Sequence, residues 1–450
     1  MVSIKTMENL LEAPLFAKSN KKPLNSGQEL VAKAFFDFLL DPNSTEFGIS
    51  GPGGTGKTFL MSHLIDDTMP AYMETCSLMG TKPLYNEVVM TATTNKAAEV
   101  LAQATGRPTS TYHSFQGLIV KNDFKTGEAN VVPSKSFNIK KNKIIFVDEA
   151  SMIDRQLLKY AREGTHQCKL VFVGDASQLL PVKENKSPVY AGNIPTHYLT
   201  EQMRTDAPEL KALHQQLRDT VEGKTGFLPI KCIPGIIDWV QGEEMEKLVL
   251  SHFTQPTNSR IVAYTNDQVI NYNNYIREAN GYVGEYSIGE QLVSNSAVRL
   301  GMEDRLSIEQ DVKLIDQDSS TRMIPVTGDL ELEVRDSTLD LGYGGIVSEV
   351  PVPTDPEYFN RLVKWLGKEK NWEPYFRLKE TIPDLRATHA CTVHKSQGST
   401  YDTIFIDADD LSSCRQPDMV ARLLYVAVSR ARKRVVFYGN LASKYGGLTF

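Results

Sequence analysis

Short apolar runs alternate with stretches of helical spacing along the first part of the chain. The runs lie at residues 47–50, 88–90, 144–147 and 170–173. Before the first run, Ser26 and Glu29 have the spacing of a capping box. The apolar residues that follow fall on one helical face: Leu30, Val31, Ala34, Phe35, Phe38 and Leu39. Regular alternation of strand and helix predicts a parallel sheet covered by helices on both faces.

A second alternating region has the same character. A strand-like run at 260–264 leads into a helical pattern from about residue 267, and the alternation resumes at 403–406, 419–428 and 435–438. We therefore expect a second parallel sheet, with the two α/β layers stacked around a cleft.

Two segments break this alternation. Residues 283–382 carry short alternating runs such as 311–315 and 330–334, which predict a β-rich insertion with one helix near 358–365. A shorter segment, 119–143, has the turn Lys125–Glu128 between strand-like arms and predicts a hairpin. With these insertions we predict a first domain over 1–195, containing the hairpin, and a second over 196–282 and 383–450.

Composition limits the classes of protein that fit. A chain of 450 residues exceeds the usual size of one core, and 41% hydrophobic with 23% charged residues is typical of soluble domains. The net charge of −6 neither supports nor excludes binding of nucleic acid, because phosphate contacts depend on where Lys and Arg lie. The five cysteines are scattered, which favours the reducing cytoplasm over a disulfide-bonded protein. Residues 1–23 have no continuous apolar core, so we expect no signal peptide. We expect no membrane span.

The strongest chemical signal is a complete phosphate-binding loop. It follows the run 47–50, precedes a helical pattern and consists of Gly51, Pro52, Gly53, Gly54, Thr55, Gly56, Lys57 and Thr58. Glycines allow backbone N–H groups to surround a polyphosphate, and the helix N-terminus adds positive potential. Lys57 is expected to reach the β- and γ-phosphates, and Thr58 to bind Mg²⁺. The loop predicts ATP and Mg²⁺ as cofactors.

Other polar residues follow predicted strands and suit the same chemistry. Asp148 is expected to bind the Mg²⁺ that bridges the phosphates, and Glu149 to orient or deprotonate the attacking water. Gln178 suits contact with a γ-phosphate or its water, although a lone Gln after a strand is more often a loop residue. Arg204 and Arg430 can neutralise transition-state charge if they face Lys57 across the cleft.

Three further segments are rich in hydrogen-bond donors, two of them with aromatic residues nearby, as expected for single-stranded nucleic acid. The residues predicted to contact DNA are Thr94, Asn95, Lys96, His113, Phe115, Thr392, His394, Lys395 and Gln397. Gln28, at the start of the first helix, can read an adenine edge through its amide.

In their order along the chain, these segments resemble the motifs of the superfamily 1 helicases. The resemblance covers nearly the whole chain outside the insertions, with Gln28 like the Q-motif, 51–58 like motif I and 148–149 like motif II. Residues 93–98 resemble motif Ia, 110–115 motif Ib and 174–178 motif III. Arg204 resembles the arginine of motif IV, 392–398 resemble motif V and 425–432 resemble motif VI. This resemblance implies an α/β fold of two RecA-like parallel-sheet domains.

The segment 178–182, Gln-Leu-Leu-Pro-Val, resembles the RecD-like and Dda-like group, which moves 5′→3′. The same group implies that 119–143 is a strand-separating pin, with Phe124 or Phe137 pressing on bases, and that 283–382 is SH3-like. Whether Asn95 or Lys96 makes the motif Ia contact stays open, because Asn95 departs from the histidine of the Dda-like proteins.

The leading hypothesis is an ATP-driven 5′→3′ DNA helicase that acts on single-stranded and forked DNA as a monomer. Single-strand-binding, replication and recombination proteins are candidate partners. The alternatives are a translocase that strips proteins from DNA and an accessory subunit that no longer hydrolyses nucleotide. The intact set Lys57, Asp148, Glu149, Gln178, Arg204 and Arg430 argues against the last.

Overall fold

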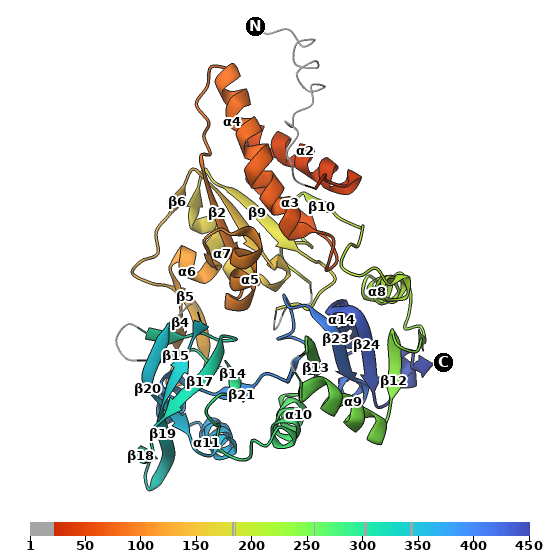
Figure 1. Ribbon diagram of the computed structural model, residues 1–450. Coiled ribbons are helices and arrows are strands. Elements are labelled where there is room, and N and C mark those ends of the chain that lie inside the picture. Colours follow the sequence, from red (N-terminus) through yellow and green to blue (C-terminus); the bar gives the residue numbers. More distant parts are fainter. Residues whose placement is uncertain (1–21, 182–183, 185, 256, 301–303, 343–344) are drawn as a thin grey trace. The chain divides into compact units, whose positions relative to one another are not determined.

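The computed structural model describes residues 22–181, 184, 186–255, 257–300, 304–342 and 345–450 (Figure 1). Most of residues 1–23, in which we expect no leader sequence, lie outside the described residues. Val182, the last residue of the segment 178–182, lies outside them as well. The chain forms two compact units. The first comprises Met1–Gly117, Ser134–Ala176 and Leu180–Arg204, and the second Leu118–Pro133, Ser177–Leu179 and Thr205–Phe450.

The first unit is built on a parallel six-stranded sheet, as predicted. Its strands, in spatial order, are β10 (Thr196–Tyr198), β1 (Glu46–Ser50), β9 (Lys169–Gly174), β7 (Lys143–Asp148), β2 (Glu87–Ala92) and β3 (Thr109–Thr111). The central strands β7 and β9 are buried along almost their whole length. Because parallel strands end at one edge, the segments after β1, β7 and β9 meet there.

Helices cover this sheet. They are α2 (Ser26–Leu40), α3 (Lys57–His63), the π-helix η1 (Leu64–Thr68), α4 (Met69–Leu78), α5 (Asn95–Thr105), α6 (Tyr112–Gln116), the 3-10 helix η2 (Ala150–Met152) and α7 (Arg155–Glu163). A core that includes Phe35, Phe47 and Phe146 joins α2 to the strands, with ring centroids 5.7 and 5.8 Å from Phe35.

The start of α2 differs from the prediction. The capping box is formed by Asn25 and Gln28, since each side chain accepts a hydrogen bond from the other's backbone N–H, and not by Ser26 and Glu29. Leu30, expected on the buried face, is 70% exposed, while Ala32 and Phe36 are buried. The buried face of α2 therefore includes Ala32 and Phe36 and leaves Leu30 in solvent.

The second unit contains a parallel five-stranded sheet, which confirms the second α/β layer. In spatial order its strands are β12 (Ile237–Val240), β24 (Ala431–Tyr438), β23 (Tyr401–Asp407), β13 (Ser259–Ala263) and β22 (Ala390–Thr392). Its helices are α8 (Pro208–Val221), α9 (Glu243–Phe253), α10 (Asn266–Ala279), α13 (Ala408–Ser412) and α14 (Pro417–Ser429). The strands β11 (Ile230–Lys231) and β25 (Leu448–Thr449) form a separate parallel ribbon, and Ile230 packs into the core of this unit.

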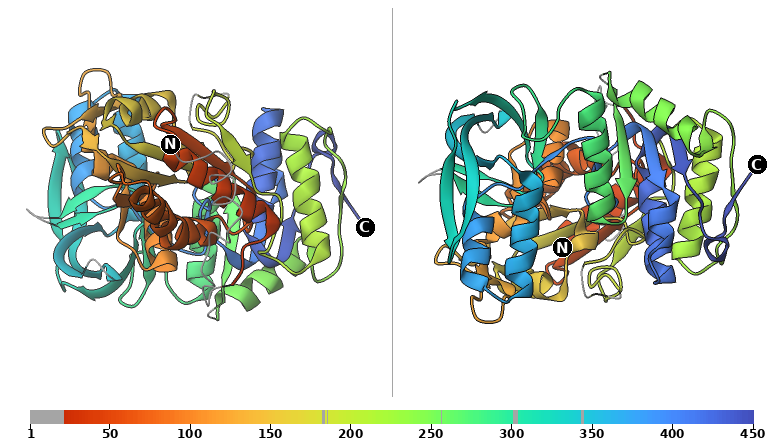
Figure 2. Two further views of the ribbon diagram at one scale, coloured as in Figure 1. Left: turned by 90° about the horizontal axis from the view of Figure 1, so that it is seen from above. Right: turned by 90° about the horizontal axis from the view of Figure 1, so that it is seen from below.

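The predicted β-rich insertion lies between α10 and β22. It contains β14 (Gln291–Ser294), β17 (Asp311–Gln317), β18 (Arg322–Thr327), β19 (Leu330–Asp340), β20 (Ile346–Pro353) and β21 (Leu385–Ala387) in one antiparallel sheet, and the ribbon β15 (Val298–Leu300) with β16 (Asp304–Leu306). Two helices, α11 (Pro356–Lys368) and α12 (Trp372–Thr381), pack on it through Phe359, Leu362 and Leu378 (Figure 2).

The predicted hairpin is also present, with β4 (Leu118–Asn122) antiparallel to β5 (Ala129–Pro133). Its turn carries Phe124, whose ring lies edge-on to Phe376 of α12 at 5.4 Å. Asn122 donates to Glu380 at 2.7 Å, and a Cβ on Gly127 would lie 2.4 Å from Trp372. The hairpin therefore groups with the second unit. It ends before Phe137, which belongs to the first unit and faces Tyr160.

Among the described residues, no helix is both long and apolar enough to cross a membrane.

Candidate nucleotide and nucleic-acid sites

The phosphate-binding loop turns between the end of β1 at Ser50 and the start of α3 at Lys57. Gly54 and Gly56 have φ of 87° and 76°, in the left-handed region where only glycine is unstrained. Gln28 donates through Nε2 to the Thr55 carbonyl at 3.1 Å and accepts from the Asn25 N–H at 3.1 Å. The loop is thus tied to α2, and both ends of the Gln28 amide are engaged in that link.

Lys57 lies folded over this loop. Its Nζ donates to the carbonyl oxygens of Gly51 and Pro52 at 2.7 and 3.0 Å. Burial lowers the pKa of the ammonium, and the carboxylates of Asp175, Glu149 and Asp148 act in the opposite direction. The positive charge is therefore held among backbone carbonyls and carboxylates at the sheet edge.

Asp148 and Glu149 stand at the end of β7. Burial, and then the neighbouring Glu149 carboxylate, raise the pKa of Asp148 to about 7. Glu149 has φ of 52°, and its Oε2 is buried without a hydrogen-bond partner among the described residues. Strained backbone and an unsatisfied buried carboxylate are features that functional sites share.

This carboxylate pair fits a divalent cation. A cation would relieve both the raised pKa of Asp148 and the unsatisfied oxygen of Glu149. The described residues contain no cluster of three or more His, Cys, Asp or Glu side chains suited to a metal. The Thr58 hydroxyl and the Asp148 carboxylate would supply two ligands, and phosphate and water oxygens would complete the site. Mg²⁺ is bound in this way in many nucleotide sites.

Arg204 lies directly against the loop. A Cβ on Gly53 would stand 2.7 Å from Arg204 Nη1, and one on Gly54 would stand 2.2 Å from the Arg204 Cβ. Met203, the preceding residue, donates its N–H to the Gly54 carbonyl at 2.7 Å. Arg204 therefore comes from the same unit as Lys57, whereas the sequence suggested an arginine from the facing layer.

Two residues at this edge carried no predicted role of their own, although Asp175 lies within the motif III-like segment 174–178. Asp175 is fully buried just after β9, and it is the largest of the charges that raise the pKa of Lys57. Tyr190 lies beside it, with its hydroxyl donating to the Ile49 carbonyl at 3.3 Å; burial and then Asp175 raise its pKa. The position of Asp175 at a strand end could have signalled it, but Tyr190 follows no strand and had no sequence signal.

Gln178 and Gln397 meet in the second unit. Gln178 Oε1 accepts from Gln397 Nε2 at 3.2 Å, and its carbonyl accepts from Arg422 Nη1 at 2.5 Å. The motif III glutamine is therefore bonded to the predicted DNA segment 392–398.

Arg430 follows α14 and is 1% exposed. Its guanidinium donates to the Val426 carbonyl at 3.2 Å, the Ser399 carbonyl at 3.4 Å and the Ser429 hydroxyl at 2.8 Å. These contacts tie it to the end of α14 and to Ser399, the residue after the segment 392–398, within the second unit.

The predicted DNA residues of the first unit lie after β2 and β3. Thr94 caps α5 by accepting from the Ala97 N–H, Asn95 is exposed, and Lys96 pairs with Glu99 at 3.3 Å. In α6, burial lowers the pKa of His113, and the Lys140 ammonium lies 5.0 Å from the Phe115 ring.

In the second unit, Thr392 ends β22 and its hydroxyl accepts from the Lys395 N–H at 3.4 Å. Burial lowers the pKa of His394, which favours the neutral form of this ring. Lys395 reaches a carboxylate of the β-rich insertion, Glu309.

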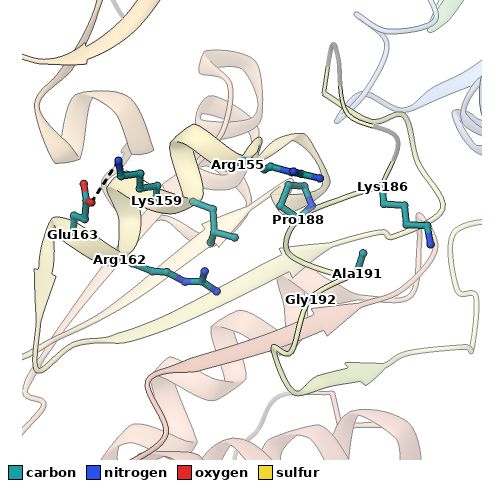
Figure 3. A pocket seen from close by; sticks show the side chains of 9 residues that line it. Arg155, Lys159, Arg162, Glu163, Lys186, Pro188, Ala191 and Gly192 are labelled. Atoms are coloured by element: carbon teal, nitrogen blue, oxygen red, sulfur yellow. Dashed lines mark ion pairs between the residues drawn. The ribbon is translucent and has the colours of Figure 1, made fainter.

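A separate cavity of about 630 Å³ lies beside α7 (Figure 3). Arg155, Lys159, Arg162 and Lys186 line it, and the first three are paired with Glu184, Glu163 and Glu46. No residue of the phosphate-binding loop lines this cavity, so it is distinct from the nucleotide site.

Comparisons with known proteins agree with this arrangement. Residues 23–227 match the family described as "AAA domain", and 387–438 match "UvrD-like helicase C-terminal domain". The ATP-dependent DNA helicase dda of Enterobacteria phage T4 is 24% identical over 86% of this chain and 93% of its own length. An uncharacterized protein of Acanthamoeba polyphaga mimivirus, R530, is 21% identical over 92% of this chain and 99% of its own.

Among solved structures, the Pif1 helicase from Bacteroides, in complex with ADP-AlF3 and ssDNA, is similar in fold with a TM-score of 0.51. It is 15% identical, with 94% of each chain covered. A phosphate-binding loop at the edge of a RecA-like parallel sheet, followed by a second parallel α/β layer, defines a motor ATPase of the helicase class. The chain is similar to superfamily 1 helicases of the Pif1 and Dda type.

Proposed function

We propose that this protein hydrolyses ATP with Mg²⁺ to move 5′→3′ on single-stranded DNA and to separate duplex DNA. The observation that carries the proposal is the convergence of Lys57, Asp148, Glu149 and Arg204 around one glycine loop. A cation, two carboxylates and an arginine at a helix N-terminus are the groups that phosphoryl transfer requires.

Each residue has a distinct part in this chemistry. Lys57 would leave the carbonyls of Gly51 and Pro52 to contact the phosphates. Thr58 and Asp148 would hold Mg²⁺, which supplies charge neutralisation between the phosphates. Glu149, with its unsatisfied Oε2, would accept a hydrogen bond from the attacking water. Arg204, against Gly53 and Gly54, would stabilise the charge that develops on the transferred group.

The link to DNA would pass through Gln178. It follows Asp175 closely in sequence, and its side chain bonds Gln397 in the DNA segment. A shift of Gln178 on nucleotide binding would therefore alter Gln397 directly.

Two assays on the same preparation test the proposal. ATPase activity with and without single-stranded DNA tests the motor, and unwinding of partial duplexes with a 5′ or a 3′ tail tests polarity. We expect DNA-stimulated hydrolysis and unwinding only with the 5′ tail. A preference for the 3′ tail would overturn the polarity, and stimulation without unwinding would favour the protein-stripping translocase.

Replacing Glu149 with Gln should preserve binding of Mg-ATP and slow hydrolysis at least about 10²-fold, the lower end for loss of a positioned base. The amide keeps the size of the carboxylate but cannot take a proton. Single-turnover hydrolysis and nucleotide binding by fluorescence measure the two effects separately. If Glu149→Gln loses nucleotide binding instead, the residue has a structural role.

Replacing Phe124 with Ala should impair unwinding about tenfold and leave DNA-stimulated ATPase nearly unchanged. Phe124 is 54% exposed, so its ring can stack on a base at the fork while it also contacts the Phe376 ring. Base–aromatic stacking is worth about 1–3 kcal/mol, comparable to about 1.4 kcal/mol for one step of DNA stacking.

The matched control is Phe137→Ala, because Phe137 lies outside the hairpin and faces Tyr160 in the first unit. An equal loss of unwinding and ATPase in Phe124→Ala would mean that the hairpin is only structural. A selective unwinding defect in Phe137→Ala would assign the strand-parting role to that ring.

A further inference from the structure

The β-rich insertion places a carboxylate on the lysine that the DNA segment offers to phosphate. Lys395 Nζ lies 2.5 Å from Glu309 Oε1 and also donates to Asn295 Oδ1. Both side chains of the ion pair are partly exposed, at 26% for Lys395 and 23% for Glu309. The pair is thus reachable from solvent and by a phosphate group.

The backbone holds Glu309 in this place. Glu309 lies in the turn between β16 and β17 with φ of 63°, a left-handed conformation that costs a non-glycine residue free energy. Its N–H donates to the Ser294 carbonyl at 2.8 Å, and the Ser294 N–H donates to the Gln310 carbonyl at 3.0 Å. The turn is therefore fixed to the end of β14, which places the Glu309 carboxylate beside Lys395.

Asn295, the second partner of Lys395, is fixed in the same way. Its N–H donates to the Asp384 carbonyl at 2.8 Å, and its Nδ2 donates to Asp384 Oδ2 at 2.5 Å. Arg386 in turn pairs with Asp384 at 3.0 Å. With the amide nitrogen occupied, the Asn295 oxygen is directed at the ammonium. Two acceptors of the insertion thus hold the Lys395 side chain.

A phosphate oxygen needs the same ammonium that Glu309 already neutralises. That ammonium has three donors, and Glu309 and Asn295 take two of them, so a phosphate bound there lies beside the Glu309 carboxylate and the two anions repel each other. We propose that Glu309 is an internal competitor for the DNA backbone, so that gripping DNA at Lys395 exchanges one anion for another. The inference rests on the proposed function, because it takes Lys395 as a DNA contact.

Exchange of Glu309 for a DNA phosphate on Lys395 would help a motor to release DNA after each step. A lysine without a competitor would bind phosphate strongly at every position and release it slowly. A carboxylate held beside it lowers the affinity of each contact and gives the ammonium a partner when a phosphate departs. Glu309 would therefore weaken static binding and favour release.

A purely structural role for Glu309 predicts the opposite sign. If the carboxylate only orients Lys395 for DNA, its neutralisation loosens the lysine and weakens binding. If it competes, its neutralisation frees the lysine and strengthens binding. The direction of the change in Kd separates the two roles.

The test compares Glu309→Gln with wild type and with Glu349→Gln, using a fluorescent oligothymidylate and anisotropy titrations without nucleotide. Glu349 is an exposed residue of the same insertion, also at positive φ of 58°, so the control makes the same charge change. We expect Glu309→Gln to bind about fivefold more tightly, which is about 1 kcal/mol. Glu349→Gln should match wild type, and thermal melting should confirm that all three chains are folded.

Unchanged or weaker binding by folded Glu309→Gln would overturn the competition. An equal gain in Glu349→Gln would attribute the effect to net charge and overturn it as well. Failure of the wild-type chain to bind the oligonucleotide at all would instead contradict the proposed function. Lys395→Gln completes the set, because the gain from Glu309→Gln should vanish in the double variant.

Discussion

Lys57→Ala should abolish ATP hydrolysis and DNA unwinding while the fold stays intact. The loop forms through glycine backbone and the Gln28–Thr55 bond, neither of which requires the lysine side chain. What is lost is the ammonium to which we assign the phosphate contact, and it lies in a buried place with three carboxylates nearby. Steady-state ATPase and fork unwinding measure the loss, and circular dichroism with thermal melting measures the fold.

Lys169→Ala is an informative comparison, because Lys169 is also a buried lysine of the first unit. Its ammonium donates to the Asp41 and Ser44 carbonyls and lies 4.4 Å from the Phe38 ring. We expect this variant to melt at a lower temperature and the folded fraction to remain active. Turnover of Lys57→Ala within about tenfold of wild type would contradict the assignment of Lys57.

Arg204→Ala should lower kcat by about 10³-fold with a modest change in ATP affinity, as expected for an arginine that stabilises transition-state charge. Its guanidinium lies against Gly53, close enough to act on a phosphate held by the loop. The same size of effect is expected for Arg430→Ala, but Arg430 is fully buried and makes several hydrogen bonds, so its melting temperature must be measured first. Pre-steady-state hydrolysis and nucleotide binding separate kcat from affinity.

The control for Arg204 is Arg155→Ala, since Arg155 is an arginine of the same unit with a side chain 85% exposed. It should leave kcat unchanged. An intact kcat in Arg204→Ala would show that the guanidinium only shields the loop. A folded Arg430→Ala with wild-type kcat would leave Arg430 as a structural support for the segment 392–398.

Patterns that are local in the chain predicted much of this protein. The buried strands β7 and β9 were visible as apolar runs, because a strand covered on both faces needs apolar side chains throughout. The loop 51–58 was visible because close backbone approach to phosphate demands glycines at fixed spacing. The antiparallel hairpin followed from its turn residues, and the likeness to helicases followed from the order of the motifs.

Other features depended on residues that are distant in sequence. Three contacts cannot be predicted from neighbouring residues, because the two partners meet only after the strands and turns are assembled. They are Arg204 with Gly53, Tyr190 with Ile49 and Glu309 with Lys395. The sequence alone also favoured Ser26 over Asn25 as the cap of α2.

The sequence by itself thus determined the sheets, the phosphate loop and the class of protein, because those depend on periodicity and on glycines at set positions. Only the tertiary structure decided which arginine lies on the loop, that Phe137 is outside the hairpin, and which carboxylate holds Lys395. The physical reason is that a charge or a ring acts on whatever lies within a few ångströms, and folding sets that distance.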